Sequence, residues 1–279
     1  MMVLRSLYGR AYWTLWPNRP LEYKTESSGV LLLEPGHSFT GCFWPAVDRY
    51  ESDVRAALFH FLREGSVFID CGANVGYFSV LAHGIVGSSG RVIAIEANPL
   101  TFRLLQRNLQ RNGLKEAINC AVASSSGEIT LYMPATGDIY SSLRTGGLVV
   151  GNNIQSFKVP GKTLDEIVRP LNLRNIDLIK IDVEGAEIEV LRSAAEVVAK
   201  YRPAIICEYG TNTWPAFGAS KSDLDSLMRQ YGYVIGRFDV DAGSVCAAEP
   251  ETFSSPYTNL ILLPERSSDS GEPIGQRSE

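Results

Sequence analysis

The chain has 279 residues, and 45% of them are hydrophobic, which is enough to form the core of one three-layer α/β domain. Its formal net charge of −5 at pH 7 argues against nucleic acid as the main partner, because a phosphate backbone is bound by a basic field. The five cysteines include no C-x-x-C pair, and they favour reduced thiols in a cytoplasmic protein without a zinc site.

Residues 1–50 are expected to form an N-terminal extension. The extension begins with an apolar and aromatic stretch, but arginines interrupt this stretch and Pro17 ends it short of the ~20 residues that span a bilayer. We expect this part of the chain to pack on the core as an amphipathic segment. Contact of Trp13 and Trp16 with a membrane surface is the alternative, and it is not favoured.

A helix is predicted over residues 50–62. Its apolar positions recur at helical spacing, and Ser52 is its expected N-cap. His60 lies within this helix and is interpreted as a packing or surface residue rather than a catalytic one.

The first strand of the sheet and the loop that follows it form the central motif. The apolar run 67–69 is typical of a strand buried on both faces, and Asp70 ends it. Gly72 and Gly76 then allow the backbone to turn sharply and to approach a ligand closely before the next helix begins.

The second strand covers residues 92–95 and ends in Glu96, one strand-helix-strand crossover after Asp70. A carboxylate at this place can accept both hydroxyls of a ribose. The preceding loop, D-C-G-A-N-V-G, lacks the glycine spacing that meets a pyrophosphate, and its acid would repel one. The same acid would attract an ammonium group. S-adenosylmethionine carries both an ammonium group and a ribose, so the pattern favours this kind of nucleoside over a dinucleotide.

Further elements follow in chain order. Asn98 and Pro99 are expected to cap and open a helix. Residues 117–123 predict a third strand beside the adenine, and residues 127–133 predict another strand. The irregular stretch 134–153 is interpreted as a lid over the substrate, with a plain surface loop as the alternative.

Two more strands, over residues 176–181 and 204–207, are followed by acids. Asp182 and Glu184 come after the first of these strands, and Glu208 comes after the second. Ligands of open parallel sheets bind outside the carboxyl ends of the strands, so we expect these acids to meet at one edge. An acid in this position can instead cap the next helix, which is the alternative interpretation.

The rest of the pattern is a set of helices and closing strands. It predicts a capping box at Thr163 and Glu166, helices over residues 187–200 and 222–231, and two strands over residues 233–238 and 259–263.

Four motifs carry a family resemblance, namely IDCGANVGYFS, VIAIEANP, KIDVEGAE and AIICE, in that order along the chain. Together they resemble the FkbM family of class I S-adenosylmethionine-dependent methyltransferases, which are mostly O-methyltransferases of natural products and sugars. The resemblance implies a Rossmann-like class I methyltransferase fold, an α/β architecture whose seven-stranded, mostly parallel sheet has helices on both faces. The methyltransferase domain would cover residues 51–264, followed by a disordered tail over residues 265–279. Ser141 and Ser142 resemble a serine-containing element of the family.

The expected activity is transfer of a methyl group from S-adenosylmethionine to a hydroxyl of a saccharide or secondary metabolite. The expected cofactor site consists of Asp70, Gly72, Ala73, Asn74, Gly76, Glu96, Ala97, Ala121 and Val122. Asp182 is the first candidate for positioning the acceptor or removing its proton, and Glu208 and Glu184 come next. A divalent metal held by Asp182, Glu208 and Asn212 is conceivable but not favoured, and no metal ligand is assigned.

Two other classes of function stay open at this point. A nicotinamide-dependent dehydrogenase would also use the crossover and the acid Glu96. A non-catalytic module would keep the fold as an interaction surface, although intact acids at every strand end argue against it.

Overall fold

The structure is a computed structural model that describes residues 11–34, 40, 50–134, 154–248 and 256–265. Ser141, Ser142 and the rest of the expected lid beyond residue 134 lie outside the described residues, as does the expected tail from residue 266 onward.

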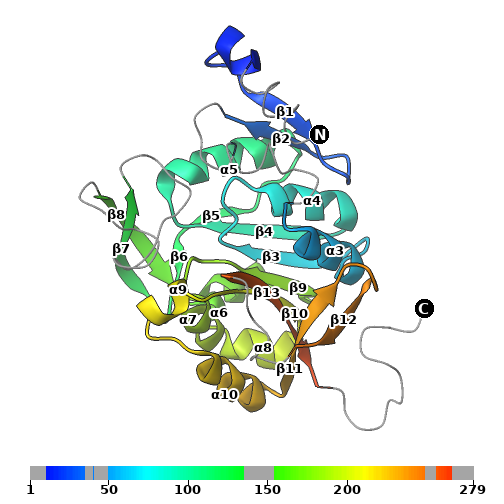
Figure 1. The fold of residues 1–279 in the computed structure, drawn as a ribbon, viewed down its shortest axis with the longest axis vertical. Helices are drawn as coiled ribbons and strands as arrows, with labels where there is room; N and C mark the ends of the chain where they lie inside the picture. The colour runs from blue at the N-terminus through cyan, green and yellow to red at the C-terminus, as the bar shows by residue number, and fades with distance from the viewer. Residues whose placement is uncertain (1–10, 35–39, 41–49, 135–153, 249–255, 266–279) are drawn as a thin grey trace.

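An eight-stranded sheet forms the centre of the molecule (Figure 1). Its members are β3 (Val67–Cys71), β4 (Arg91–Glu96), β5 (Ala117–Asn119), β9 (Leu178–Ile181), β10 (Ala204–Gly210), β11 (Tyr233–Asp239), β12 (Ser244–Ala247) and β13 (Tyr257–Pro264). They lie in the order β12-β11-β13-β10-β9-β3-β4-β5. The strands from β10 to β5 pair in parallel, whereas β13 runs antiparallel between β10 and β11. Each of the seven strands expected in the sheet therefore has a counterpart, and β12 extends the sheet by a hairpin with β11.

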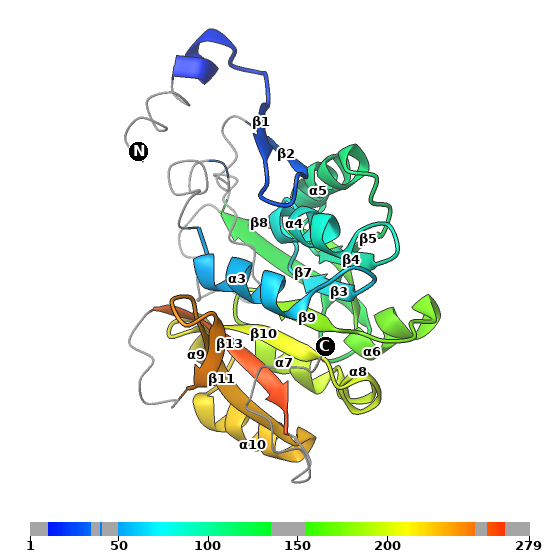
Figure 2. The ribbon, with the colours of Figure 1, turned by 90° about the vertical axis from the view of Figure 1, so that its right-hand side faces the viewer.

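Helices cover both faces of this sheet (Figure 2). One face carries α3 (Ser52–Phe61), α4 (Tyr77–Val86) and α5 (Pro99–Arg111), and the other carries α6 (Leu164–Val168), α7 (Glu187–Arg192), α8 (Ala195–Tyr201) and α10 (Lys221–Tyr231). The short helices η1 (Arg169–Leu171) and α9 (Thr213–Ala216) complete the described set. Because side chains alternate along a strand, Phe68 and Leu178 pack toward the first face while Ile69 and Ile179 pack toward the second.

Two of the three predicted helix caps are present. The Asn98 side chain accepts a hydrogen bond from the backbone N–H of Leu100, and Thr163 and Glu166 form the predicted capping box. The prediction for Ser52 is wrong, because Glu51 is the N-cap of α3 and Ser52 already lies in the helix. The backbone of Glu51 has a left-handed φ of 39°, so the chain enters the helix one residue earlier than the side-chain pattern indicates.

The predicted strand over residues 117–123 is divided between two sheets. Residues of β5 pair with β4, whereas β6 (Ala121–Val122) joins β7 (Gly127–Pro134) and β8 (Ile154–Lys162) in a separate sheet of order β6-β8-β7. The Asn119 side-chain amide donates hydrogen bonds to the carbonyl oxygens of Glu96 and Ala97, at 2.7 and 3.1 Å. This contact holds the chain where it leaves the central sheet.

The described part of the N-terminal extension packs on α4 and α5 (Figure 1). It contains the antiparallel hairpin of β1 (Leu21–Lys24) and β2 (Val30–Leu33). The backbone N–H groups of Val30 and Leu32 donate to the side-chain oxygens of Asn112 and Asn108, both at 2.7 Å. Among the described residues, no helix has the length and apolar character required to cross a bilayer.

Candidate active site

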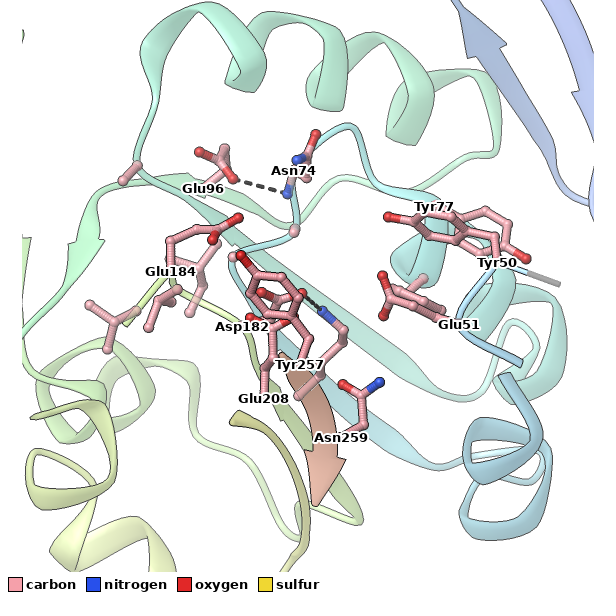
Figure 3. A pocket seen from close by; sticks show the side chains of 18 of the residues that line it. Tyr50, Glu51, Asn74, Tyr77, Glu96, Asp182, Glu184, Glu208, Tyr257 and Asn259 are labelled. Carbon is pink, nitrogen blue, oxygen red and sulfur yellow. Dashed lines mark hydrogen bonds and ion pairs between the residues drawn. The ribbon is translucent and has the colours of Figure 1, made fainter. Parts of the chain in front are cut away.

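A cavity of about 610 Å³ lies at the carboxyl ends of the parallel strands (Figure 3). One side of it is formed by the turn after β3, the end of β4 and the small sheet. The opposite side is formed by the start of α3, the start of α4 and the closing strands β11 and β13. The cavity therefore lies at the edge where the predicted acids were expected to meet.

The turn after β3 is a closely packed part of the cavity wall. Gly72, Asn74 and Gly76 have φ values of 82°, 49° and 91°, in the left-handed region that favours glycine. A β-carbon on Gly72 would lie 1.8 Å from the carbonyl oxygen of Asp182, so two strand ends approach each other here at backbone distance. The N–H groups of Gly72 and Ala73 both donate to the carbonyl oxygen of Ile95, at 3.0 and 2.9 Å.

Glu96 is held beside this turn by backbone donors. Its carboxylate accepts hydrogen bonds from the N–H of Asn74 at 2.9 Å and from the N–H of Asn98 at 2.7 Å. Burial raises the pKa of Glu96 to about 7, and these two backbone hydrogen bonds oppose the rise. Each carboxylate oxygen keeps a lone pair that can accept a further donor from a ligand.

Gly72, Ala73, Asn74, Glu96, Ala97, Ala121 and Val122, all expected in the cofactor site, line the cavity. Asp70 and Gly76 lie behind the turn instead. Asp70 is 1% exposed and accepts a hydrogen bond from the Ser79 hydroxyl at 2.6 Å, and burial raises its pKa. A β-carbon on Gly76 would lie 2.7 Å from Leu105, so this glycine allows the close packing of α5 against the turn.

Asp182, Glu184 and Glu208 also line the cavity, as Figure 3 shows. The Lys180 ammonium donates to the Oδ2 atom of Asp182 at 2.6 Å. Burial raises the pKa values of Glu184 and Glu208 well above the usual range, and the charge of Asp182 raises them further. The three acids predicted from the strand ends thus form one cluster.

Glu187 completes this cluster from behind and was not predicted as a site residue. It is 1% exposed, and its Oε1 atom accepts hydrogen bonds from the N–H groups of Val183 and Gly185, at 2.9 and 3.1 Å. Carboxylate oxygens of Asp182, Glu187 and Glu208 lie within 4.8 Å of one another, and such oxygens are ligands that magnesium prefers. Asn212, the third ligand considered from the sequence, does not line the cavity.

The wall opposite the glycine turn was largely missed by the sequence analysis. It contains Tyr50, Glu51, Tyr77, Phe78, Arg237, Phe238, Tyr257 and Asn259. Burial raises the pKa of Glu51 to about 7, and the charge of Lys180 opposes the rise. The Oε2 atom of Glu51 is buried and has no hydrogen-bond partner among the described residues. No local signal identifies this wall, because it assembles from elements that are distant in sequence.

The sheet order and the site together define the class of the protein. The antiparallel strand β13 lies between β10 and β11 at one side of an otherwise parallel arrangement, which β12 extends by a hairpin. This order, with a cavity formed by a glycine turn and an acid at neighbouring strand ends, is typical of a class I methyltransferase. The Methyltransferase FkbM domain matches residues 70–235, which is more than half of the chain. The chain belongs to the FkbM methyltransferase family, and the resemblance seen in its motifs is confirmed.

Three relatives illustrate the range of this similarity. Methyltransferase sdnD of Sordaria araneosa is 28% identical over 204 residues, which are 61% of this chain and 74% of sdnD. The hexuronic acid methyltransferase AglP of Haloferax volcanii is 27% identical over 198 residues, covering 68% of this chain and 77% of AglP. The 31-O-demethyl-FK506 methyltransferase FkbM of Streptomyces tacrolimicus is 30% identical over 156 residues, which are 47% of this chain and 60% of that protein.

Proposed function

We propose that this methyltransferase uses S-adenosylmethionine to methylate a hydroxyl group of a small molecule, either a saccharide or a secondary metabolite. One observation carries the proposal: Glu96 and Asp182, at the ends of two strands that flank β3, line the same cavity on either side of the glycine turn. The first carboxylate suits a ribose and the second suits an acceptor hydroxyl.

The cofactor would occupy the wall formed by the glycine turn and the small sheet. Glu96 would accept hydrogen bonds from the ribose hydroxyls, and Ala97, Ala121 and Val122 would contact the adenine through apolar surface. The turn from Gly72 to Gly76 would hold the amino-acid part. Asp70 lies behind this turn and would attract the ammonium group through its charge rather than by direct contact.

The acceptor would occupy the wall that carries Asp182. When bound, S-adenosylmethionine supplies a methyl group already activated by a positive sulfur. The protein then has to hold the acceptor oxygen in line and exclude water, and orientation of this kind contributes ~7–11 kcal/mol in well-aligned reactions. Asp182 would take the hydroxyl proton on a carboxylate oxygen, while Glu208 and Glu184 would bind neighbouring hydroxyl groups.

The relatives support the choice of acceptor class. The name of AglP refers to a hexuronic acid, and that of the Streptomyces FkbM protein refers to O-methylation of a natural product. Both are small molecules, which fits a cavity of about 610 Å³. Lys180 and Arg237 are the cations among the described wall residues, and Lys180 is paired with Asp182, so the cavity offers little to a phosphate backbone and nucleic acid is not part of the proposal.

The first test is calorimetric titration with S-adenosylhomocysteine, with NAD as the control. We expect saturable binding of S-adenosylhomocysteine and none of NAD. The second test is incubation with methyl-labelled S-adenosylmethionine and a panel of sugar and polyketide alcohols. Binding of NAD alone would overturn the proposal in favour of a dehydrogenase, and binding without transfer to any alcohol would favour a non-catalytic module.

A further inference from the structure

Lys180 is a buried cation in the cavity wall that the proposed chemistry does not use. It lies on β9, where its register partner on β3 is Asp70, and it is 2% exposed. Its ammonium is 2.6 Å from the Oδ2 atom of Asp182 and lies over the Phe78 ring, 5.0 Å from the ring centre. A buried ammonium is costly unless it is paired, so the position of this side chain is strongly constrained.

Several carboxylates compete for this one ammonium. Glu51 at the start of α3, Asp70 on β3 and Asp182 after β9 all interact with its charge. Arg237, the other cation that lines the described cavity, is exposed on β11. Among these acids, Lys180 forms its ion pair with Asp182, whereas the Oδ1 atom of Asp70 and the Oε2 atom of Glu51 have no hydrogen-bond partner among the described residues.

The pairing with Asp182 distinguishes two roles for Lys180, namely neutralisation of buried charge and positioning of a carboxylate. If the lysine only neutralised buried charge, the fully buried Asp70 would be the partner with most to gain, because its carboxylate is the least hydrated. The ammonium instead holds Asp182, whose side chain is 21% exposed and faces the cavity. The contact fixes one oxygen of a carboxylate that is partly open to the cavity.

We propose that Lys180 is a positioning residue, which holds the Oδ2 atom of Asp182 and so directs its other carboxylate oxygen toward the acceptor hydroxyl. The inference rests on the proposed function, in which Asp182 positions the acceptor or removes its proton. Lys180 acts through Asp182, so its removal disturbs the alignment of the acceptor and not the binding of the cofactor.

The test compares Lys180→Met, Lys180→Arg, Asp182→Asn and the double variant Lys180→Met/Asp182→Asn. We expect Lys180→Met to lower kcat by about 10- to 100-fold with little change in KM, because small misplacements of reacting groups cost rates of this size. Lys180→Arg restores the charge and part of the rate. The double variant is no slower than Asp182→Asn, because the lysine acts only through this acid. Affinity for S-adenosylhomocysteine stays within about threefold of the wild type in each variant.

Two outcomes would overturn the inference. Additive losses in the double variant would show that Lys180 acts independently of Asp182, and an unchanged kcat in Lys180→Met would show that the ion pair has no part in alignment. If Lys180→Met does not fold, Lys180→Arg serves as the test. The planar guanidinium group of arginine cannot reproduce the single contact of the lysine ammonium with the Oδ2 atom of Asp182. In this variant kcat should fall while folding and cofactor binding persist.

A crystallographic comparison tests the role of Lys180 separately from the proposed function. Failure of the wild type to bind S-adenosylhomocysteine would refute the proposed function. Independently of activity, crystal structures of the wild type and of Lys180→Met should differ in the rotamer of Asp182, and an unchanged carboxylate in the variant would refute the role of Lys180.

Discussion

The α-carbon of Gly72 packs directly against the carbonyl group of Asp182, so that a β-carbon at residue 72 would lie 1.8 Å from the carbonyl oxygen. This contact joins the cofactor turn after β3 to the loop that carries the candidate catalytic acid. A side chain on residue 72 would therefore push apart the two halves of the proposed site.

Gly72→Ala tests this relationship. The substitution combines a left-handed φ of 82° with a backbone collision, so we expect a larger loss of unfolding free energy than the roughly 1–2 kcal/mol that a left-handed residue costs alone. Gly113→Ala is the matched control, because residue 113 has a φ of 79° and no atom within 4 Å of the added carbon. Urea unfolding of both variants measures the difference. Equal losses would show that the contact with Asp182 relaxes at no cost.

Glu96→Gln tests the cofactor wall. The amide keeps one acceptor for the backbone donors but loses the charged hydrogen bonds to a ribose, each worth roughly 1.5–3 kcal/mol. We expect the affinity for S-adenosylhomocysteine to fall tenfold or more in a calorimetric titration. Glu128→Gln removes a carboxylate from an exposed ion pair with Lys158 and should leave the affinity unchanged. A Glu96 variant that binds as tightly as the wild type would remove this residue from the site.

Asp182→Asn tests the assignment of the acceptor acid. The amide has a similar shape but cannot take a proton, so we expect kcat to fall by about 10²- to 10⁴-fold while cofactor affinity changes little. Glu208→Gln and Glu184→Gln should affect KM for the acceptor more than kcat. Steady-state kinetics with a single acceptor distinguishes these patterns. A larger loss of kcat in Glu208→Gln than in Asp182→Asn would reverse the assigned roles.

The parts of this fold that could be predicted are those where local chemistry and tertiary packing agree. Strands β3 and β9 are buried along their whole length and are apolar apart from Asp70 and Lys180, so the sequence pattern alone identifies them. The acids at their ends could be placed at one edge because parallel strands share that edge. The family, the class of fold and the seven strands expected in the central sheet are accordingly confirmed.

The parts that could not be predicted depend on contacts between distant residues. At the break between β5 and β6, the Asn119 side chain donates hydrogen bonds to the carbonyl oxygens of Glu96 and Ala97. The order of residue types in 117–123 does not indicate these contacts. Strand β8 has mostly exposed side chains along its first half and shows the alternation that identifies a strand only from Phe157 onward. Glu51 lines the cavity from a left-handed backbone at the start of α3, a conformation that the sequence does not indicate.

The stability of the ligand-free protein should depend on pH through its buried acids. Burial raises the pKa of Glu187 from 4.5 to about 7, so the folded state binds more protons than the unfolded state between these values. The free energy of unfolding should therefore fall as the pH rises from about 4.5 to about 7. In Glu187→Gln this fall should be smaller, because the amide still accepts from Val183 and Gly185 but does not ionise. Urea unfolding at about pH 5 and about pH 7.5 measures both slopes, and identical slopes would contradict the assignment.

Removal of divalent metal is expected to leave methyl transfer within about twofold of its original rate. The oxygens of Asp182, Glu187 and Glu208 are close enough to bind a cation, but the ammonium of Lys180 already neutralises Asp182 at 2.6 Å. A divalent ion would have to compete with this ammonium for the carboxylate of Asp182. The measurement is the initial rate before and after dialysis against EDTA, with added magnesium as the control. A tenfold loss that magnesium restores in the wild type, but not in Glu187→Gln, would instead identify the three carboxylates as a metal site.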